Sequence, residues 1–224
     1  MTLPRIAAVL LALQDMEILY LILGWLLGLL SPQISERISR HYKKRDLRIG
    51  LISELKEIRY RLILTTYLLS RKAVVFNKDL IEWVRKQLED YKERDHTKMT
   101  LSVLEKLSAD PSQIAVIRSL SYDEETGLSL KKFYLPFIEA KTDFFPVFGD
   151  GCRNLLFQIR FQIQALNEEI DNVLFYFRKT FDSSMSPVNH EIVRKNLTHG
   201  FENLARQTKL ITEKINDLLK TGLE

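Results

Sequence analysis

Hydrophobic residues in the last third of the chain recur at alternating steps of three and four, the spacing of one helical face. One stripe predicts a helix capped by Asp150 and running to about Asp182, and a second predicts a helix opened by Ser186-Pro187. The first stripe holds Ile159, Ile163, Leu166, Ile170, Val173 and Phe177, and the second holds Leu197, Phe201, Leu204, Thr208, Ile211, Ile215 and Leu218. Since only the short breaker DSSMSP separates them, we expect an antiparallel, coiled-coil-like hairpin.

The region before this hairpin keeps the helical period and shows almost no strand alternation. A long helix is predicted from Ser35 to Ser70, with a stripe of Leu51, Leu55, Ile58, Leu62 and Leu69. Shorter helices are predicted at Asn77–Arg94 (with Asn77 as the cap), Thr100–Leu107, Pro111–Leu120 and Ser129–Lys141. Each stripe is too narrow to bury a core alone, so the pattern predicts an all-α bundle dominated by three long helices.

The stretch from Phe133 to Phe148 concentrates six aromatic residues and two prolines. A clustered aromatic loop can dock a partner. We expect instead that these side chains fill the core beneath a bent connection.

An uncharged run from Ile18 to Leu30 contains nine Leu or Ile residues, which favour membrane insertion by roughly 3–5 kcal/mol. Thirteen residues rise only about 20 Å, against about 30 Å of hydrocarbon, so a spanning helix must also recruit Leu10–Glu17. Gly24 and Gly28 form a GxxxG motif that lets membrane helices approach closely. We therefore interpret residues 1–34 as a membrane anchor that ends at Ser31-Pro32, and residues 35–224 as a helical bundle. A cleaved signal peptide and an in-plane or buried helix are the alternatives.

Positive charge is concentrated directly after this run. The segment Glu36–Arg61 holds nine Lys or Arg against four acids, whereas the whole chain carries a net charge of +4. The residues nearest the run are Arg37, Arg40, Lys43, Lys44 and Arg45, which we call the basic cluster. Anionic lipid attracts such residues by about 1 kcal/mol each. Because positive residues stay inside, we expect a single pass of the membrane, with the N-terminus outside and the bundle cytoplasmic.

The composition excludes several classes of function. The chain has 224 residues, of which 46% are hydrophobic, so it is not disordered. Cys152 is its one cysteine, and its four histidines show no metal-ligand spacing. No glycine-rich phosphate loop occurs. We therefore expect no metal and no cofactor, and the confinement of the positive charge to one segment argues against DNA as a partner.

One motif could carry catalysis. The segment Arg194-Lys195-Asn196-Leu197-Thr198-His199 resembles the R-x(4–6)-H motif of HEPN domains. The resemblance implies an all-helical bundle in which Arg and His from two protomers form a metal-independent ribonuclease site. Five residues turn a helix by about 500°, which leaves the two side chains about 140° apart and favours a site across a dimer. His199 would be the base and Arg194 the phosphate ligand.

The order of anchor, basic cluster and helical domain is also similar to the HEPN-like membrane accessory proteins of type VI-B CRISPR systems, which form oligomeric pores. That resemblance implies that Arg194 and His199 brace contacts between subunits. Our first hypothesis is therefore a non-enzymatic, membrane-anchored, homo-oligomeric bacterial effector or scaffold. The resemblance further implies that the assembly forms a pore and acts in anti-phage defence. A cytoplasmic protein or RNA would bind its bundle. The alternative is a membrane-tethered HEPN-type ribonuclease.

Overall fold

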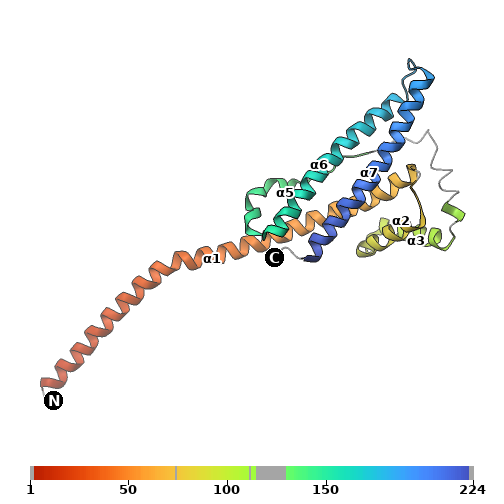
Figure 1. Ribbon diagram of the computed structural model, residues 1–224. Helices are drawn as coiled ribbons and strands as arrows, with labels where there is room; N and C mark the ends of the chain where they lie inside the picture. Colours follow the sequence, from red (N-terminus) through yellow and green to blue (C-terminus); the bar gives the residue numbers. More distant parts are fainter. Residues whose placement is uncertain (1–2, 74, 111, 115–129, 222–224) are drawn as a thin grey trace. The chain divides into compact units, whose positions relative to one another are not determined.

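The computed structural model describes residues 3–73, 75–110, 112–114 and 130–221, and for residues 3–22, Ile34 and Arg40 it describes the backbone only. Its elements are α1 (Leu3–Lys72), α2 (Lys78–Leu88), η1 (Glu89–Tyr91), α3 (Asp95–Ala109), α5 (Pro136–Ala140), η2 (Thr142–Val147), α6 (Asp150–Lys179) and α7 (Pro187–Thr221), as Figure 1 shows. The described residues contain helices and no strand, so the predicted all-α class is confirmed.

The chain divides into two compact units, Met1–Ile49 and Gly50–Glu224. Helix α1 contributes to both units. The sequence predicted a new helix after Ser31-Pro32, and this prediction is wrong, because α1 continues through Pro32. Pro32 has no N–H to donate to the carbonyl of Gly28, four residues earlier. Both residues are exposed, so that carbonyl can still be reached by other hydrogen-bond donors.

The second unit is built on α1 from Gly50 onward, α6 and α7 (Figure 1). The predicted hairpin is confirmed, since α6 and α7 pack along their length. Its two stripes are buried apart from the half-buried Phe177 and Leu197, and the stripe of α1 is buried throughout. The two helices approach closely at Gly200, where an added Cβ would lie 2.5 Å from Val173 Cγ2. Glycine is therefore required there by packing.

The polar member of the α7 stripe has a partner on α1. Thr66 and Thr208 are buried, and their hydroxyl oxygens lie 2.8 Å apart. Each hydroxyl has one hydrogen to donate: Thr66 directs it to Thr208 Oγ1 or to the carbonyl of Leu62, and Thr208 directs it to the carbonyl of Leu204. Hydrogen bonding removes most of the cost of burying these two polar groups.

A smaller lobe of α2, η1 and α3 packs on α1 with its own core. That core contains Tyr60, Ile63, Tyr67, Phe76, Ile81, Val84, Leu88, Tyr91, Leu104, Leu107 and Ile114. The predicted cap is confirmed, since Asn77 Oδ1 accepts from the N–H of Leu80 at 2.9 Å. The chain turns into η1 after Leu88, so the helix is shorter than the predicted Asn77–Arg94. Helix α3 is longer than the predicted Thr100–Leu107, and most of Pro111–Leu120 lies outside the described residues.

The connection that leads into α6 differs from the predicted helix Ser129–Lys141, because of residues 130–141 only Pro136–Ala140 is helical. Side chains of the long helices replace the missing backbone partners. Glu54 accepts from the N–H groups of Phe137 and Ile138 at 2.8 and 2.9 Å. Asn167 both accepts from the N–H of Phe133 and donates to its carbonyl.

Half of the six aromatic residues of this connection fill the core, and Phe137 is half-buried. Phe133, Phe145 and Phe148 are buried, whereas Tyr134 and Phe144 are exposed. The next helix begins one residue from the prediction: Gly149 holds the cap position of α6, and Asp150 lies in its first turn, where it binds Arg153 at 2.7 Å.

Candidate functional site

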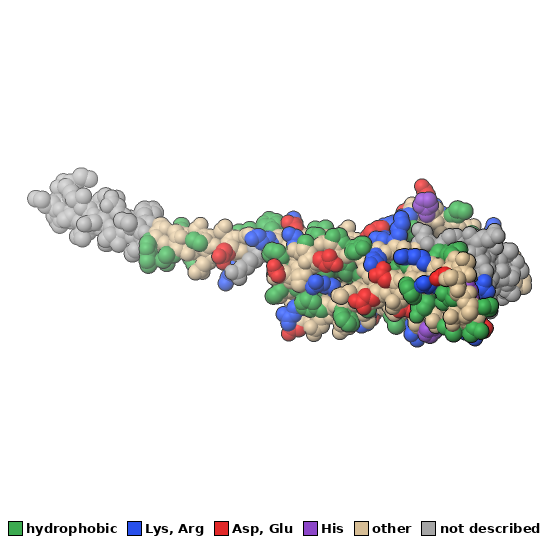
Figure 2. All heavy atoms as spheres, turned by 90° about the horizontal axis from the view of Figure 1, so that it is seen from above, with side chains coloured by type: hydrophobic (Ala, Val, Ile, Leu, Met, Phe, Trp, Pro, Cys, Tyr) green, Lys and Arg blue, Asp and Glu red, His purple; other side chains and the backbone are tan. Residues whose placement is uncertain are grey.

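The apolar run lies on the part of α1 that belongs to the first unit, and its described side chains are exposed. Exposed fractions range from 42% for Leu26 to 66% for Trp25. The exposed set comprises Leu23, Trp25, Leu26, Leu27, Leu29 and Leu30. Figure 2 shows these hydrophobic side chains at the surface where the described side chains of this unit begin. An added Cβ at Gly24 or Gly28 would meet nothing within 4 Å, so within the described chain the GxxxG face is open.

The basic cluster follows on the same helix. Arg37, Lys43 and Arg45 are exposed and Lys44 is half-buried, while the side chain of Arg40 lies outside the description. Arg45 lies 3.9 Å from Asp46 and over the ring of Tyr42 at 5.2 Å. Both contacts are solvent-exposed and therefore weak.

Among the side chains that the structure describes, no helix offers a stretch long and apolar enough to cross a membrane. The part of the predicted anchor before Leu23 lies outside those side chains.

Both residues of the R-x(4)-H motif lie on α7 and are exposed. His199 Nδ1 lies 3.8 Å from Glu202 Oε2, and 72% of its side chain is open to solvent. Lys195, between them, pairs with Glu191 at 2.8 Å, and this contact lowers the pKa of the Glu191 carboxyl. The positions of Arg194 and His199 five residues apart on one continuous helix agree with the predicted separation about the axis. An active site that uses both would therefore require a second chain.

Metal-ligating residues do not gather within the described part of the chain, where no group of three or more His, Cys, Asp or Glu side chains could hold an ion. Cys152 is half-buried in the first turn of α6.

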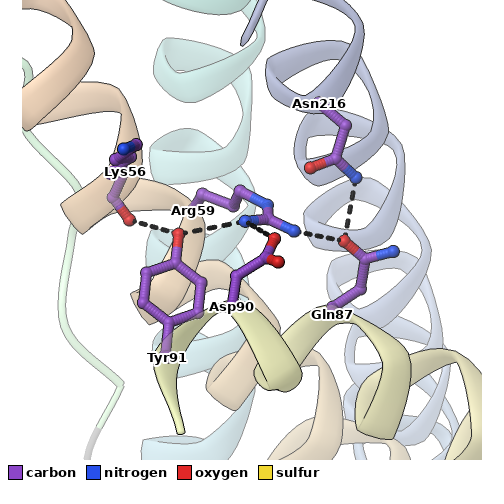
Figure 3. A network of polar contacts seen from close by, with 6 residues as sticks. All are labelled: Lys56, Arg59, Gln87, Asp90, Tyr91 and Asn216. Atoms are coloured by element: carbon purple, nitrogen blue, oxygen red, sulfur yellow. Dashed lines mark hydrogen bonds and ion pairs between the residues drawn. The ribbon is translucent and has the colours of Figure 1, made fainter. Parts of the chain in front are cut away.

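A network of polar side chains that sequence reasoning missed joins α1, the lobe and α7 (Figure 3). Arg59 is its centre, with a side chain only 8% exposed. Its guanidinium donates to Asp90 Oδ2 at 2.8 Å, to Gln87 Oε1 at 2.8 Å and to Tyr91 Oη at 3.3 Å. Asn216 of α7 donates to the same Gln87 oxygen at 2.9 Å, so one arginine and one glutamine connect three parts of the second unit.

The tyrosine of this network is held from two sides. Tyr91 Oη donates to the carbonyl of Lys56 at 2.8 Å, and burial raises the pKa of Tyr91 in spite of the nearby Arg59. Arg94 lies over the ring of Tyr60 at 4.2 Å and pairs with Glu57 at 2.8 Å. The hydrogen bond that Arg94 donates to the Glu57 carboxylate raises the pKa of Arg94. Since Arg59 is buried and its partners belong to this chain, we interpret the network as a structural contact that holds the lobe against α1 and α7.

Arg59 falls inside the basic segment Glu36–Arg61, which sequence reasoning read as one charged region. The spacing of Arg59, four residues after Leu55 and three before Leu62, places it on the buried face of α1 and could have predicted its burial.

Comparison with family models, with curated proteins and with solved structures found no match to this chain.

Proposed function

We propose that this protein is a membrane-anchored, self-associating effector or scaffold of a bacterial cell, with its N-terminal helix in the inner membrane, its N-terminus outside and its second unit in the cytoplasm. The observation that carries the proposal is the exposed apolar surface of the first unit directly before the basic cluster, in which Arg37, Lys43 and Arg45 are exposed. Contiguous apolar surface of this kind marks a membrane or partner site. Cations that follow it favour the cytoplasmic side of an anionic membrane.

The open face at Gly24 and Gly28 supports association between copies in the membrane, where small residues let helices pack. The resemblance to type VI-B accessory proteins extends the proposal to an assembly that acts in anti-phage defence, as a pore or as a scaffold, under the control of a cytoplasmic protein or RNA. The ribonuclease alternative remains a prediction that Arg194 and His199 can test.

The membrane part of the proposal is tested by fractionation of the full chain. Wild type should remain in the membrane pellet after an alkaline wash and leave it only with detergent. Leu23→Arg with Leu27→Arg should release the protein, because an arginine near the middle of the bilayer costs about 2.5–3.5 kcal/mol. Leu68→Arg with Val103→Arg, at exposed positions of the second unit, is the matched control and should stay in the pellet. Recovery of wild type in the supernatant without detergent would overturn the proposal.

The orientation is tested by neutralising the basic cluster. Replacing Arg37, Arg40, Lys43 and Lys44 with Gln should weaken a cytoplasmic C-terminal reporter signal, at up to about 1 kcal/mol per residue. The control replaces four exposed lysines of the lobe, Lys86, Lys92, Lys98 and Lys106. Equal reporter signals from the two quadruple variants would show that the basic cluster does not set the topology.

A further inference from the structure

Within the part of the chain that the structure describes, the α6–α7 hairpin is covered on three sides. Helix α1 lies against its buried stripes, as the Thr66–Thr208 bridge shows. The lobe covers one flank of α7, where Lys209 lies over the ring of Trp83 at 5.4 Å. The connection before α6 covers one flank of that helix, where Lys132 pairs with Asp171 at 2.7 Å.

The fourth side, which we call the outer face, carries large hydrophobic residues that remain exposed. They follow the helical period opposite the buried stripes and continue through the turn between the helices. The set is Phe157, Phe161 and Phe175 of α6, Phe181 of the turn, and Val188, Ile192 and Leu210 of α7, with exposed fractions of 41–71%. Since an aromatic side chain presents about 150–250 Å², these seven expose roughly 700 Å² per copy, against about 800 Å² per partner in a standard interface.

Between its apolar ends the outer face is polar, and the two helices differ in charge. On α6 the exposed positions between Phe161 and Phe175 include Glu168 and no cation. On α7 the exposed positions between Ile192 and Leu210 include Lys195, His199 and Arg206. A copy that packed α6 on α6 would place carboxylate over carboxylate, whereas α6 on α7 places opposite charges together.

The register of the hairpin shows what would then meet. Val173 lies level with Gly200, and Gln158 Oε1 accepts from Lys214 Nζ at 2.9 Å, so level residues have numbers that add up to 372 or 373. A two-fold axis parallel to the helices lays α6 of each copy over level residues of the other copy's α7. This register brings Glu168 opposite Arg206, Phe161 opposite Leu210 and Phe181 opposite Ile192, each within about half a helical turn.

We infer that the outer face of the hairpin binds a second copy of this chain in parallel, with α6 of each copy on α7 of the other. The inference deepens the proposed function and rests on the self-association that it includes. The parallel pairing places Gly50, where the second unit begins, at the same end of both copies. This arrangement suits two chains that are anchored in one membrane.

Cross-linking of the full chain in detergent tests the pairing. Two differently tagged copies in a Cys152→Ala background are co-expressed, one with Glu168→Cys and the other with Arg206→Cys, and treated with a short bismaleimide. Linkage between the two tags is expected, since the two positions belong to different copies. Linkage in a Glu168→Cys with Glu168→Cys pair instead would overturn the parallel arrangement, and linkage in neither pair would overturn the interface.

Charge exchange tests the energetics by sedimentation of the same full chain. Glu168→Arg should raise the dissociation constant about tenfold or more, and Glu168→Arg with Arg206→Glu should restore it. Phe161→Asp should weaken association further, while Glu105→Arg and Met99→Asp, on the exposed side of α3, should leave it unchanged. If the double variant keeps the helical circular dichroism of wild type but its dissociation constant does not recover, the pairing is refuted.

The outcomes separate this inference from the membrane proposal. If the chain stays in the washed membrane pellet but Glu168→Cys and Arg206→Cys are not linked, the membrane proposal stands and the interface is overturned. If the chain leaves the membrane but the two cysteines are linked, the interface stands and the membrane proposal is overturned.

Discussion

Removing Asp90 should destabilise the second unit more than replacing its partner Arg59 with methionine. The Arg59 side chain is 8% exposed, and among the described residues Asp90→Ala leaves its guanidinium only the neutral partners Gln87 and Tyr91; its Nε has no hydrogen-bond partner among them. Arg59→Met removes the buried charge and keeps most of the volume. Replacing a buried ion by an apolar residue of similar size is often neutral, whereas removing one partner leaves an uncompensated charge.

The geometry sets the magnitudes. Asp90 is 65% exposed, so the coulombic part is screened, and we expect about 2 kcal/mol for Asp90→Ala, below the roughly 3–5 kcal/mol of a fully buried pair. Arg59→Met should cost about 1 kcal/mol or less. The groups it leaves remain satisfied, because Gln87 still accepts from Asn216 and Tyr91 still donates to Lys56.

Thermal unfolding of the full chain in detergent measures the difference. At about 2–4 °C per kcal/mol for a unit of this size, Asp90→Ala should lower the Tm by about 4–8 °C and Arg59→Met by at most about 4 °C. Lys86→Ala and Asp217→Ala, at exposed positions, are the controls and should stay within about 0.5 kcal/mol of wild type. A Tm for Asp90→Ala equal to or above that of Arg59→Met would refute the reasoning.

Three further predictions follow from single contacts. Gly200→Ala should destabilise the second unit by about 1–3 kcal/mol in chemical unfolding through overpacking against Val173, whereas Gly28→Ala, with open space around it, should not; equal effects would contradict the close approach of α6 and α7. Hydrogen bonds from Ser184 and an ion pair with Lys179 lower the pKa of Asp182 to about 2, so NMR titration should find it there, and Ser184→Ala should raise it. Because the pKa of Asp182 is lower in the folded state than in the unfolded state, the stability that this carboxylate contributes is complete above about pH 4 and is lost as the pH falls toward 2. An Asp182→Asn variant should not show this loss of stability. If the ribonuclease alternative holds, Arg194→Ala and His199→Ala should each abolish RNA cleavage at unchanged oligomer size, and cleavage that persists in both would exclude it.

The long helices and the hairpin could be predicted because hydrophobic spacing reports a helical face directly. The same spacing could not predict the continuation through Pro32, because a proline inside a helix costs about 3 kcal/mol or more and therefore usually marks a helix boundary. It also could not predict that α5 is only five residues long, because the partners of this backbone are distant in sequence. Glu54 accepts from the first N–H groups of α5, and Asn167 pairs with the backbone of Phe133 before the helix.

Sequence reasoning missed the buried position of Arg59, because it took this residue as part of one charged segment. Which helix face is inside depends on every element packed around it, and for α1 the deciding element is the lobe that supplies Asp90 and Gln87.

The network and the outer face should act independently, and this separates stability from association. Arg59 lies where α1 meets the lobe, on the covered flank of α7 that Asn216 shares, whereas Phe161 and Glu168 lie on the exposed side of α6. Sites without shared partners have additive effects. Arg59→Met should therefore shift the Tm without changing the dissociation constant of the dimer. Glu168→Arg should raise the dissociation constant and leave unchanged the Tm that is measured at concentrations where the chain is monomeric. If Arg59→Met weakened association as well, the lobe itself would have to belong to the interface, and the second copy would lie on the flank of α7 instead of on its outer face.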